Sequence, residues 1–221
     1  MIFMDALSYP IRRGGWMIIL AGAVLSVLLH FLRIIPSVGM LVTVFSVGYF
    51  GSYYFDIISN TMTGHDAIPD WPGFSSVSDD IIWPFVRLCG LVLISFGPAV
   101  ALFWFADQKA AWYLSTFLAA VGFGCFYFPM SVLAFLALGG LGAAMPHIVI
   151  PAVFRSGSGY LLAVVGLVTG YAVCGLVQTL TEKVPFVGWV FASLVAIYCL
   201  MFQGRLIGLI YREKSEELGW E

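Results

Sequence analysis

Long runs of apolar residues, separated by short polar stretches, dominate this chain. A helix rises about 1.5 Å per residue, so roughly 20 apolar residues cross the hydrocarbon core of a bilayer. Backbone groups cannot stay unpaired in lipid, so such runs must be helices or strands of a closed barrel, and barrel strands alternate polar with apolar residues. Because these runs are continuously apolar, they predict an all-α transmembrane helical bundle. We expect six spans, at about residues 16–35, 38–58, 83–106, 110–137, 160–180 and 186–211.

Two stretches between the predicted spans are polar or broken. We expect interfacial segments at residues 59–80, which are rich in Asp, and at 138–158, which contain Pro146 and Pro151. Residues 110–146 carry no charge and, at helical rise, would reach about 55 Å, too long for one crossing. The breaks between 129 and 151 therefore have three interpretations: an interfacial segment, a re-entrant segment, or a seventh span.

The distribution of lysine and arginine favours six spans over seven, because cytoplasmic loops carry an excess of both residues. Six spans place seven basic residues on one side and three on the other, whereas seven spans give four against six. We therefore predict one integral membrane domain over residues 1–221, with both termini in the cytoplasm of a bacterium and the spans in its inner membrane. The larger group is Arg12, Arg13, Arg87, Arg155, Arg205, Arg212 and Lys214, and the smaller is Arg33, Lys109 and Lys183.

Three segments that precede apolar helices share an order of Pro, then Arg, then Gly. They read YPIRRGG from Tyr9, WPFVRLCG from Trp83 and PAVFRSGSG from Pro151. Each would enter the membrane from the cytoplasm, so the pattern indicates three parallel hairpin repeats. The alternative is chance similarity among Gly-rich apolar segments.

Composition supports a membrane protein. Hydrophobic residues make up 61% of the chain and charged residues 10%, against about 25% charged residues in a typical soluble domain. The net charge of −2 gives no sign of a nucleic-acid surface. The four cysteines lie in apolar runs without C-x-x-C spacing, which is typical of packing residues. We expect neither a metal ion nor another cofactor.

The most distinctive polar segment is TGHDAIPDWPGF, in the predicted cytoplasmic loop. Its prolines prevent a continuous helix. Three interpretations are open: an interfacial device that positions the third span, a partner-docking surface, or a metal site through the imidazole and two carboxylates. The candidate residues are His65, Asp66, Pro69, Asp70, Trp71 and Phe74.

The segment RSGSGY offers backbone N–H groups beside an arginine ahead of an apolar helix. Such a segment can contact a lipid headgroup or another anion. The alternative is a flexible entry into the helix. The candidate headgroup residues are Arg155, Ser156, Ser158 and Tyr160.

Ionisable residues inside or beside spans are costly in lipid and need partners. Asp56 can form an intramembrane ion pair with Arg87 or with Arg205, since all three lie near the predicted cytoplasmic interface. A structural ion pair is one interpretation, and a substrate or proton path is the other.

Two G-x-x-x-G motifs lie in the last two predicted spans. Gly166 and Gly170 form one, and Gly204 and Gly208 form the other. This spacing lets helix backbones approach closely. The partner helix belongs either to the same chain or to another subunit.

Several short motifs occur together in the first third of the chain: SYPIRRGGW, IPSVG, VGYF and GHDAIPDW. In these motifs the chain resembles a family of uncharacterised prokaryotic multi-pass membrane proteins, distantly similar to the Yip1-like membrane proteins. The resemblance covers residues 8–74 best and residues 126–160 more loosely. It implies a membrane-embedded helical fold and no catalytic residues.

The sequence contains no convincing pair of titratable groups for acid–base catalysis. We expect a non-catalytic integral membrane protein that serves as an accessory or scaffold subunit, with the lipid bilayer and other membrane subunits as partners. The alternative is a small permease or channel for lipid or an uncharged solute. An intramembrane enzyme would require two titratable groups in one cavity.

Overall fold

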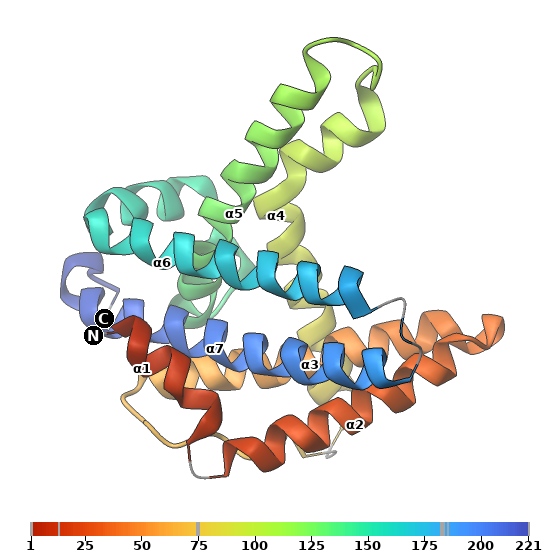
Figure 1. Cartoon of the computed structure of the whole chain (residues 1–221). Helices are drawn as coiled ribbons and strands as arrows, with labels where there is room; N and C mark the ends of the chain where they lie inside the picture. The colour runs from red at the N-terminus through yellow and green to blue at the C-terminus, as the bar shows by residue number, and fades with distance from the viewer. Residues whose placement is uncertain (1, 13, 74–75, 182–183, 185, 221) are drawn as a thin grey trace. The chain divides into compact units, whose positions relative to one another are not determined.

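The computed structural model is all-α over the residues it describes, which are 2–12, 14–73, 76–181, 184 and 186–220 (Figure 1). No strand occurs among these residues, so the predicted fold class is confirmed. The helices are α1 Ile2–Ser8, α2 Gly15–Arg33, α3 Pro36–Met62, α4 Trp83–Phe105, α5 Tyr113–Leu138, α6 Pro146–Thr181 and α7 Val187–Leu218. Short helical turns are η1 Tyr9–Ile11, η2 Ser78–Ile82 and η3 Leu141–Ala144.

Six helical segments in the described part of the chain are long and apolar enough to cross a membrane. Each matches a predicted span to within a few residues, except that the last runs past the predicted end. The chain therefore has the helices of a multi-pass membrane protein. The segments are Gly15–Arg33, Pro36–Met62, Ser78–Phe105, Tyr113–Leu138, Gly159–Thr181 and Val187–Leu218.

The broken stretch after α5 does not form a seventh crossing. Gly139 ends α5 in the left-handed conformation, with φ 77°, and η3 follows. Gly157, with φ 63°, then interrupts α6. Only residues 146–156 precede this kink, and at helical rise they extend about 16 Å, roughly half of a hydrocarbon core. The stretch is therefore a broken segment between two spans.

The chain folds into two compact units. Unit 1 contains Met1–Val86 and Val165–Arg212, and unit 2 contains Arg87–Val164 and Glu213–Glu221. The first and third predicted hairpins thus contribute to unit 1, and the second to unit 2. Lys183 and Pro185, at the turn of the third hairpin, lie outside the described residues, so the hairpin repeat stays a prediction.

In unit 1, α2 runs antiparallel to α7 and α3 runs parallel to it. Along α2, successive contacts move one turn backwards along α7: Gly22 meets Ile197, Ser26 meets Ser193 and His30 meets Trp189. Along α3, they move forwards: Ile57 meets Gly204 and Thr61 meets Gly208. If α3 is the second crossing, a parallel α7 must be an even-numbered one. The register therefore agrees with six spans and disagrees with seven.

The core of unit 1 lies between α3 and α7 and is closed by the segment that follows α3. Tyr53 and Ile57 of α3 pack with Ile197 and Met201 of α7 and with Tyr9. Tyr9, Tyr53, Ile57 and Met201 are inaccessible to solvent. The side chains of Ile68 and Trp71, from the loop after α3, pack against this cluster.

In unit 2, α4 and the second half of α5 pack against η3 and the first part of α6. Its core includes Met130, Leu133 and Ala144, all inaccessible to solvent. Polar side chains join the elements inside this core. The hydroxyls of Ser95 and Ser131 lie 3.1 Å apart between α4 and α5, and the Tyr127 hydroxyl donates to the Ala144 carbonyl at 2.6 Å.

Candidate functional site

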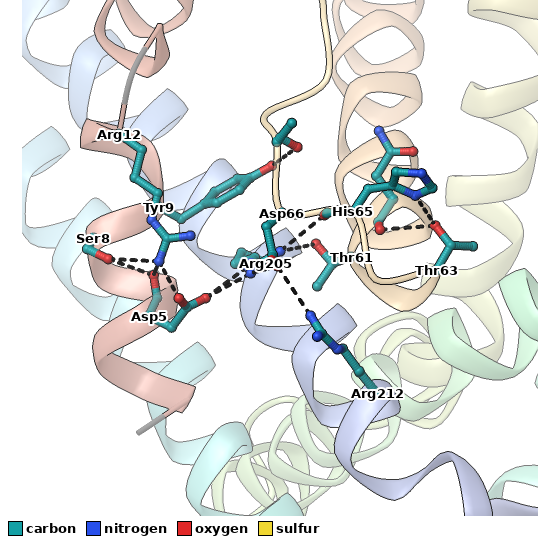
Figure 2. A network of polar contacts seen from close by, with 12 residues as sticks. Asp5, Ser8, Tyr9, Arg12, Thr61, Thr63, His65, Asp66, Arg205 and Arg212 are labelled. Carbon is teal, nitrogen blue, oxygen red and sulfur yellow. Dashed lines mark hydrogen bonds and ion pairs between the residues drawn. The ribbon is translucent and has the colours of Figure 1, made fainter.

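A buried arginine on α7 is the centre of the largest polar network in unit 1 (Figure 2). The Arg205 side chain is 2% exposed. Its guanidinium donates from Nε to Asp5 Oδ2 at 3.0 Å and from Nη2 to Asp66 Oδ1 at 2.6 Å. Nη1 lies 3.4 Å from both the Thr61 hydroxyl and the His65 carbonyl oxygen. Arg205 thus joins α1, the end of α3, the loop after α3, and α7.

A second ring of contacts surrounds this centre. Arg12 forms an ion pair with Asp5, and Arg212 Nη1 lies 3.2 Å from Asp66 Oδ1. The Arg205 guanidinium carbon also lies 5.0 Å from the centre of the Tyr9 ring, within the range of a cation–π interaction. Three arginines therefore face two carboxylates, and all three nitrogens of the central guanidinium donate to protein oxygens.

The charges shift the titration of the groups at the rim of this network. The hydrogen bond from Arg205 lowers the pKa of Asp66 below its ordinary 3.8, and Arg212 adds to the effect. Burial by itself raises the pKa of Asp5, but hydrogen bonds from Arg12 and Arg205 outweigh it, so this pKa is lowered too. Burial raises the pKa of Tyr9 to about 12. Both carboxyl groups are thus ionised at neutral pH, as an arginine-centred network requires.

The loop after α3 is fixed to the helices by tyrosine hydroxyls and by one stacked tryptophan. Tyr9 donates to the Ala67 carbonyl at 3.4 Å, Tyr53 to Pro69 at 3.4 Å, and Tyr49 to Pro72 at 3.2 Å. The Trp71 ring stacks on Tyr53 and Tyr49, with centroids 4.7 and 5.8 Å away. Prolines remove backbone donors from this loop, so hydroxyl donors from the helices satisfy its carbonyls.

The predicted loop residues divide between an inner and an outer face. Pro69 and Trp71 are half-buried against the helices, while His65, Asp66 and Asp70 are exposed. The His65 Nδ1 lies 2.9 Å from the Thr63 hydroxyl. Phe74 lies outside the described residues. Among described residues, no group of three or more His, Cys, Asp or Glu side chains is arranged to hold a metal ion.

The structure gives Arg205 other ion-pair partners than the predicted Asp56. Within the described chain its carboxylates are Asp5 and Asp66, and it forms no ion pair with Asp56. Asp56 lies on an exposed position of α3, turned away from the network. The Arg87 guanidinium lies 5.9 Å from the Phe135 ring centre in unit 2. Because Asp56 and Arg87 belong to different units, their pairing stays a prediction.

Two of the predicted headgroup residues have buried side chains. Ser156 donates to the Ala152 carbonyl one turn earlier, and Tyr160 is 1% exposed. Arg155 is exposed, with Nη1 3.5 Å from the Leu218 carbonyl oxygen. The side chain of Ser158 lies outside the described residues. Of the three candidate side chains that the structure describes, Arg155 alone is placed to meet a headgroup.

The Tyr160 hydroxyl forms hydrogen bonds with two backbone groups of α5 and does not face a lipid headgroup. It accepts from the Met130 N–H at 3.2 Å and donates to the Phe126 carbonyl. These two backbone groups are four residues apart and pair with each other in a regular helix. Pro129 lies between them, and its ring and missing N–H disturb the same turn. A side chain of α6 thus completes the proline turn of α5.

All four motif glycines pack against side chains of unit 1. A Cβ on Gly166 would lie 2.9 Å from Phe3 Cε2, and one on Gly170 would lie 3.2 Å from Gln203 Nε2. Gly204 and Gly208 similarly face α3, as described above. Both motifs therefore serve helix packing within this chain.

Sequence reasoning missed the carboxylate and the hydroxyls that complete these contacts. Asp5 and Asp56 are the two acidic residues before the first polar loop. An acidic residue in so apolar a segment requires a partner, which was an available signal. Tyr53 and Tyr160 gave none, because tyrosine in spans is usually an interfacial anchor.

The network around Arg205 is closed: its charged groups pair with one another. Its central arginine has no nitrogen left without a protein acceptor, and its carboxylates face guanidinium groups. No family model, curated protein or solved structure matches this chain.

Proposed function

We propose that this chain is a non-catalytic integral membrane protein that serves as an accessory or scaffold subunit of a membrane complex. It presents a preformed loop, residues 64–73, to a partner on the side of the membrane where Arg205 lies. We place the protein in the bacterial inner membrane with that side in the cytoplasm. The observation that carries the proposal is the fixed loop with a polar outer face.

The loop supports docking because its conformation is fixed before any partner arrives. Three tyrosine hydroxyls hold its carbonyls, and the Trp71 stack fills its inner side. Its outer side leaves His65 and Asp70 exposed. A preorganised surface loses little conformational entropy on binding, which favours affinity. A loop needed only to connect α3 and α4 would not require so many contacts.

The packing of unit 1 supports a scaffold over an enzyme or a permease. A Cβ on Gly204 would lie 2.9 Å from Ile57 Cγ2, and one on Gly208 would lie 2.7 Å from Thr61 Cγ2. Backbones this close leave no room for a hydrated path between α3 and α7. The ionisable groups of the polar network are all engaged with one another, which leaves none for acid–base work.

The docking proposal is tested by site-specific photocrosslinking in native membranes. We expect a photoreactive phenylalanine analogue at Asp70 to give one discrete adduct with a membrane protein other than this chain. The matched control carries the analogue at Leu41, a lipid-exposed position of α3 that is 70% exposed. This control should give no discrete adduct.

A second variant separates loop conformation from simple proximity. Trp71→Ala removes the stack that holds the loop, so the adduct from Asp70 should weaken several-fold while the amount of protein in the membrane stays similar. If the chain runs as a lone monodisperse monomer in mild detergent, and Asp70 gives no adduct, the scaffold proposal is wrong.

The scaffold and the permease predict opposite results in a purified system. If the chain is a scaffold, proteoliposomes containing it should take up glycerol no faster than empty liposomes in a stopped-flow swelling assay. A severalfold acceleration that Gly204→Leu abolishes would favour a permease and count against the scaffold.

A further inference from the structure

The position of α1 along α7 gives its depth in the membrane. Residues 189–204 of α7 lie alongside α2 and α3, from the contact of Trp189 with His30 to that of Gly204 with Ile57, and Arg205 is the first charged residue of α7. Positions on α7 before Arg205 therefore lie deeper in the bilayer than the polar network.

Helix α1 lies beside α7 (Figure 1). The Phe3 ring meets the Phe202 ring edge-on, with centroids 5.5 Å apart. One turn later the Tyr198 hydroxyl donates to the Leu7 carbonyl at 2.7 Å. Successive contacts run backwards along α7, so α1 is antiparallel to it. Tyr198 lies seven residues before Arg205, which at helical rise is about 10 Å deeper.

The inner face of α1 is fully used by contacts within unit 1. The Phe3 ring covers Gly166 of α6, whose missing side chain leaves space for it. Asp5 turns to Arg205 and Arg12, and Ala6 is completely buried. The helix thus brings its only charge to the buried guanidinium.

The most exposed side chains of α1 and η1 are all apolar, and the polar Asp5 and Ser8 between them are only partly exposed. Met4 is 68% exposed, Leu7 39% and Ile11 69%. Their spacing of three and four residues puts them on one helical face. Val165 of α6, next to the glycine that seats Phe3, is also exposed and apolar. The outer face of α1 is therefore continuous with the apolar surface of a candidate span at the same depth.

We propose that α1 is embedded in the leaflet on the Arg205 side, with Met4 and Leu7 against lipid acyl chains. It does not lie on the membrane surface or in water. Lipid is the occupant because the exposed side chains of this face are apolar, Leu7 meets α7 seven residues before Arg205, and the face continues the apolar surface of α6. The inference concerns lipid contact and does not depend on any partner of the exposed loop.

Spin-label accessibility tests this depth directly. Cys89, Cys125, Cys174 and Cys199 are first replaced by alanine, and the variant is accepted if it elutes and melts as the parent does. Single cysteines then replace Met4, Leu7, Leu41 and Asp70 in the full chain, each labelled with a nitroxide in liposomes. Leu41 is the control for lipid exposure, and Asp70 is the control for water.

Labels at positions 4 and 7 should collide with oxygen at least threefold more often than with a water-soluble nickel chelate, as at position 41. The label at position 70 should show the reverse preference. A nickel preference at both positions 4 and 7 would overturn the proposal in favour of an aqueous helix. Protection from both reagents, with an immobile spectrum, would overturn it in favour of a protein partner. Failure of the scaffold proposal would leave these accessibilities unchanged.

Discussion

Tyr160 provides a sharp test of how this fold satisfies polar groups in its interior. The substitution Tyr160→Phe removes only the hydroxyl that lies between the Met130 N–H and the Phe126 carbonyl. The ring keeps its packing, so any loss of stability reports the two hydrogen bonds. The phenyl ring then faces a backbone donor and acceptor that have lost their partner.

The magnitude follows from the number of groups left unpaired. A buried polar group without a partner costs about 1–3 kcal/mol, so two groups set an upper range of about 2–6 kcal/mol. Part of this cost is recovered where the Met130 N–H and the Phe126 carbonyl pair directly, as they do in a regular helix. We expect a net destabilisation of about 2 kcal/mol, or roughly 30-fold in the folding equilibrium.

The matched control is Tyr54→Phe. Tyr54 is also a buried tyrosine within a span, but its hydroxyl has no hydrogen-bond partner among the described residues. Removing an unsatisfied buried hydroxyl should leave stability unchanged or raise it by about 1 kcal/mol. The pair therefore predicts opposite signs from the same chemical change.

The assay is unfolding by SDS in mixed micelles, followed by far-UV circular dichroism at a fixed total detergent concentration. Both variants and the parent are measured in parallel. If Tyr160→Phe lies within 0.5 kcal/mol of the parent, or if both variants lose stability equally, the hydroxyl is not what completes the proline turn.

Two further predictions concern unit 1. Gly208→Ala should destabilise the fold by about 1–3 kcal/mol and lower its melting temperature, because the new Cβ would lie 2.7 Å from Thr61 Cγ2. The control Gly175→Ala, whose Cβ would have no atom within 4 Å, should leave stability unchanged or raise it by up to about 1 kcal/mol. Equal melting shifts for the two variants would contradict the close approach of α3 and α7. Asp5 and Asp66 have lower pKa values in the folded protein than the ordinary 3.8, so their carboxylates stabilise the fold fully above about pH 5. This stabilisation is lost as the pH falls through 3.8 towards the lower pKa values of the folded protein. The gap in melting temperature between the parent and the Asp5→Asn, Asp66→Asn double variant should therefore narrow from pH 6 to pH 3, and a constant gap would show that the carboxylate charges do not stabilise the fold.

The spans were predictable because hydrophobic length is a local property. Pro36 marks the start of α3 and Gly139 the end of α5, and both residues act through their own backbone preferences. The kink at Gly157 also follows from a glycine in an otherwise continuous helix. Element boundaries of this kind need no knowledge of distant residues.

The partners inside the site were not predictable because they are distant in sequence. Asp5 and Arg205 are separated by 200 positions, and Tyr160 reaches a helix 34 residues earlier. Proximity to a predicted interface favoured Asp56 for Arg205, since both were expected near the same side. Helix rotation decides the pairing instead: Asp56 occupies an exposed position of α3, whereas Thr61 faces α7. A single sequence gives no measure of that rotation.

The two polar features of this chain obey one physical requirement with different means. An ionised arginine near the end of a span needs carboxylates, and the chain supplies them from α1 and from the loop after α3. A proline within a span frees backbone groups, and the chain supplies a hydroxyl from α6. Each solution fixes an element that hydrophobic burial alone would leave free to slide: α1 against α7, the loop against α3, and α6 against α5. Because these groups are engaged within the chain, the scaffold proposal requires a partner to use polar groups that remain exposed, and His65 and Asp70 on the fixed loop are such groups. The exposed loop is therefore the place where a loss of binding without a loss of stability should be sought.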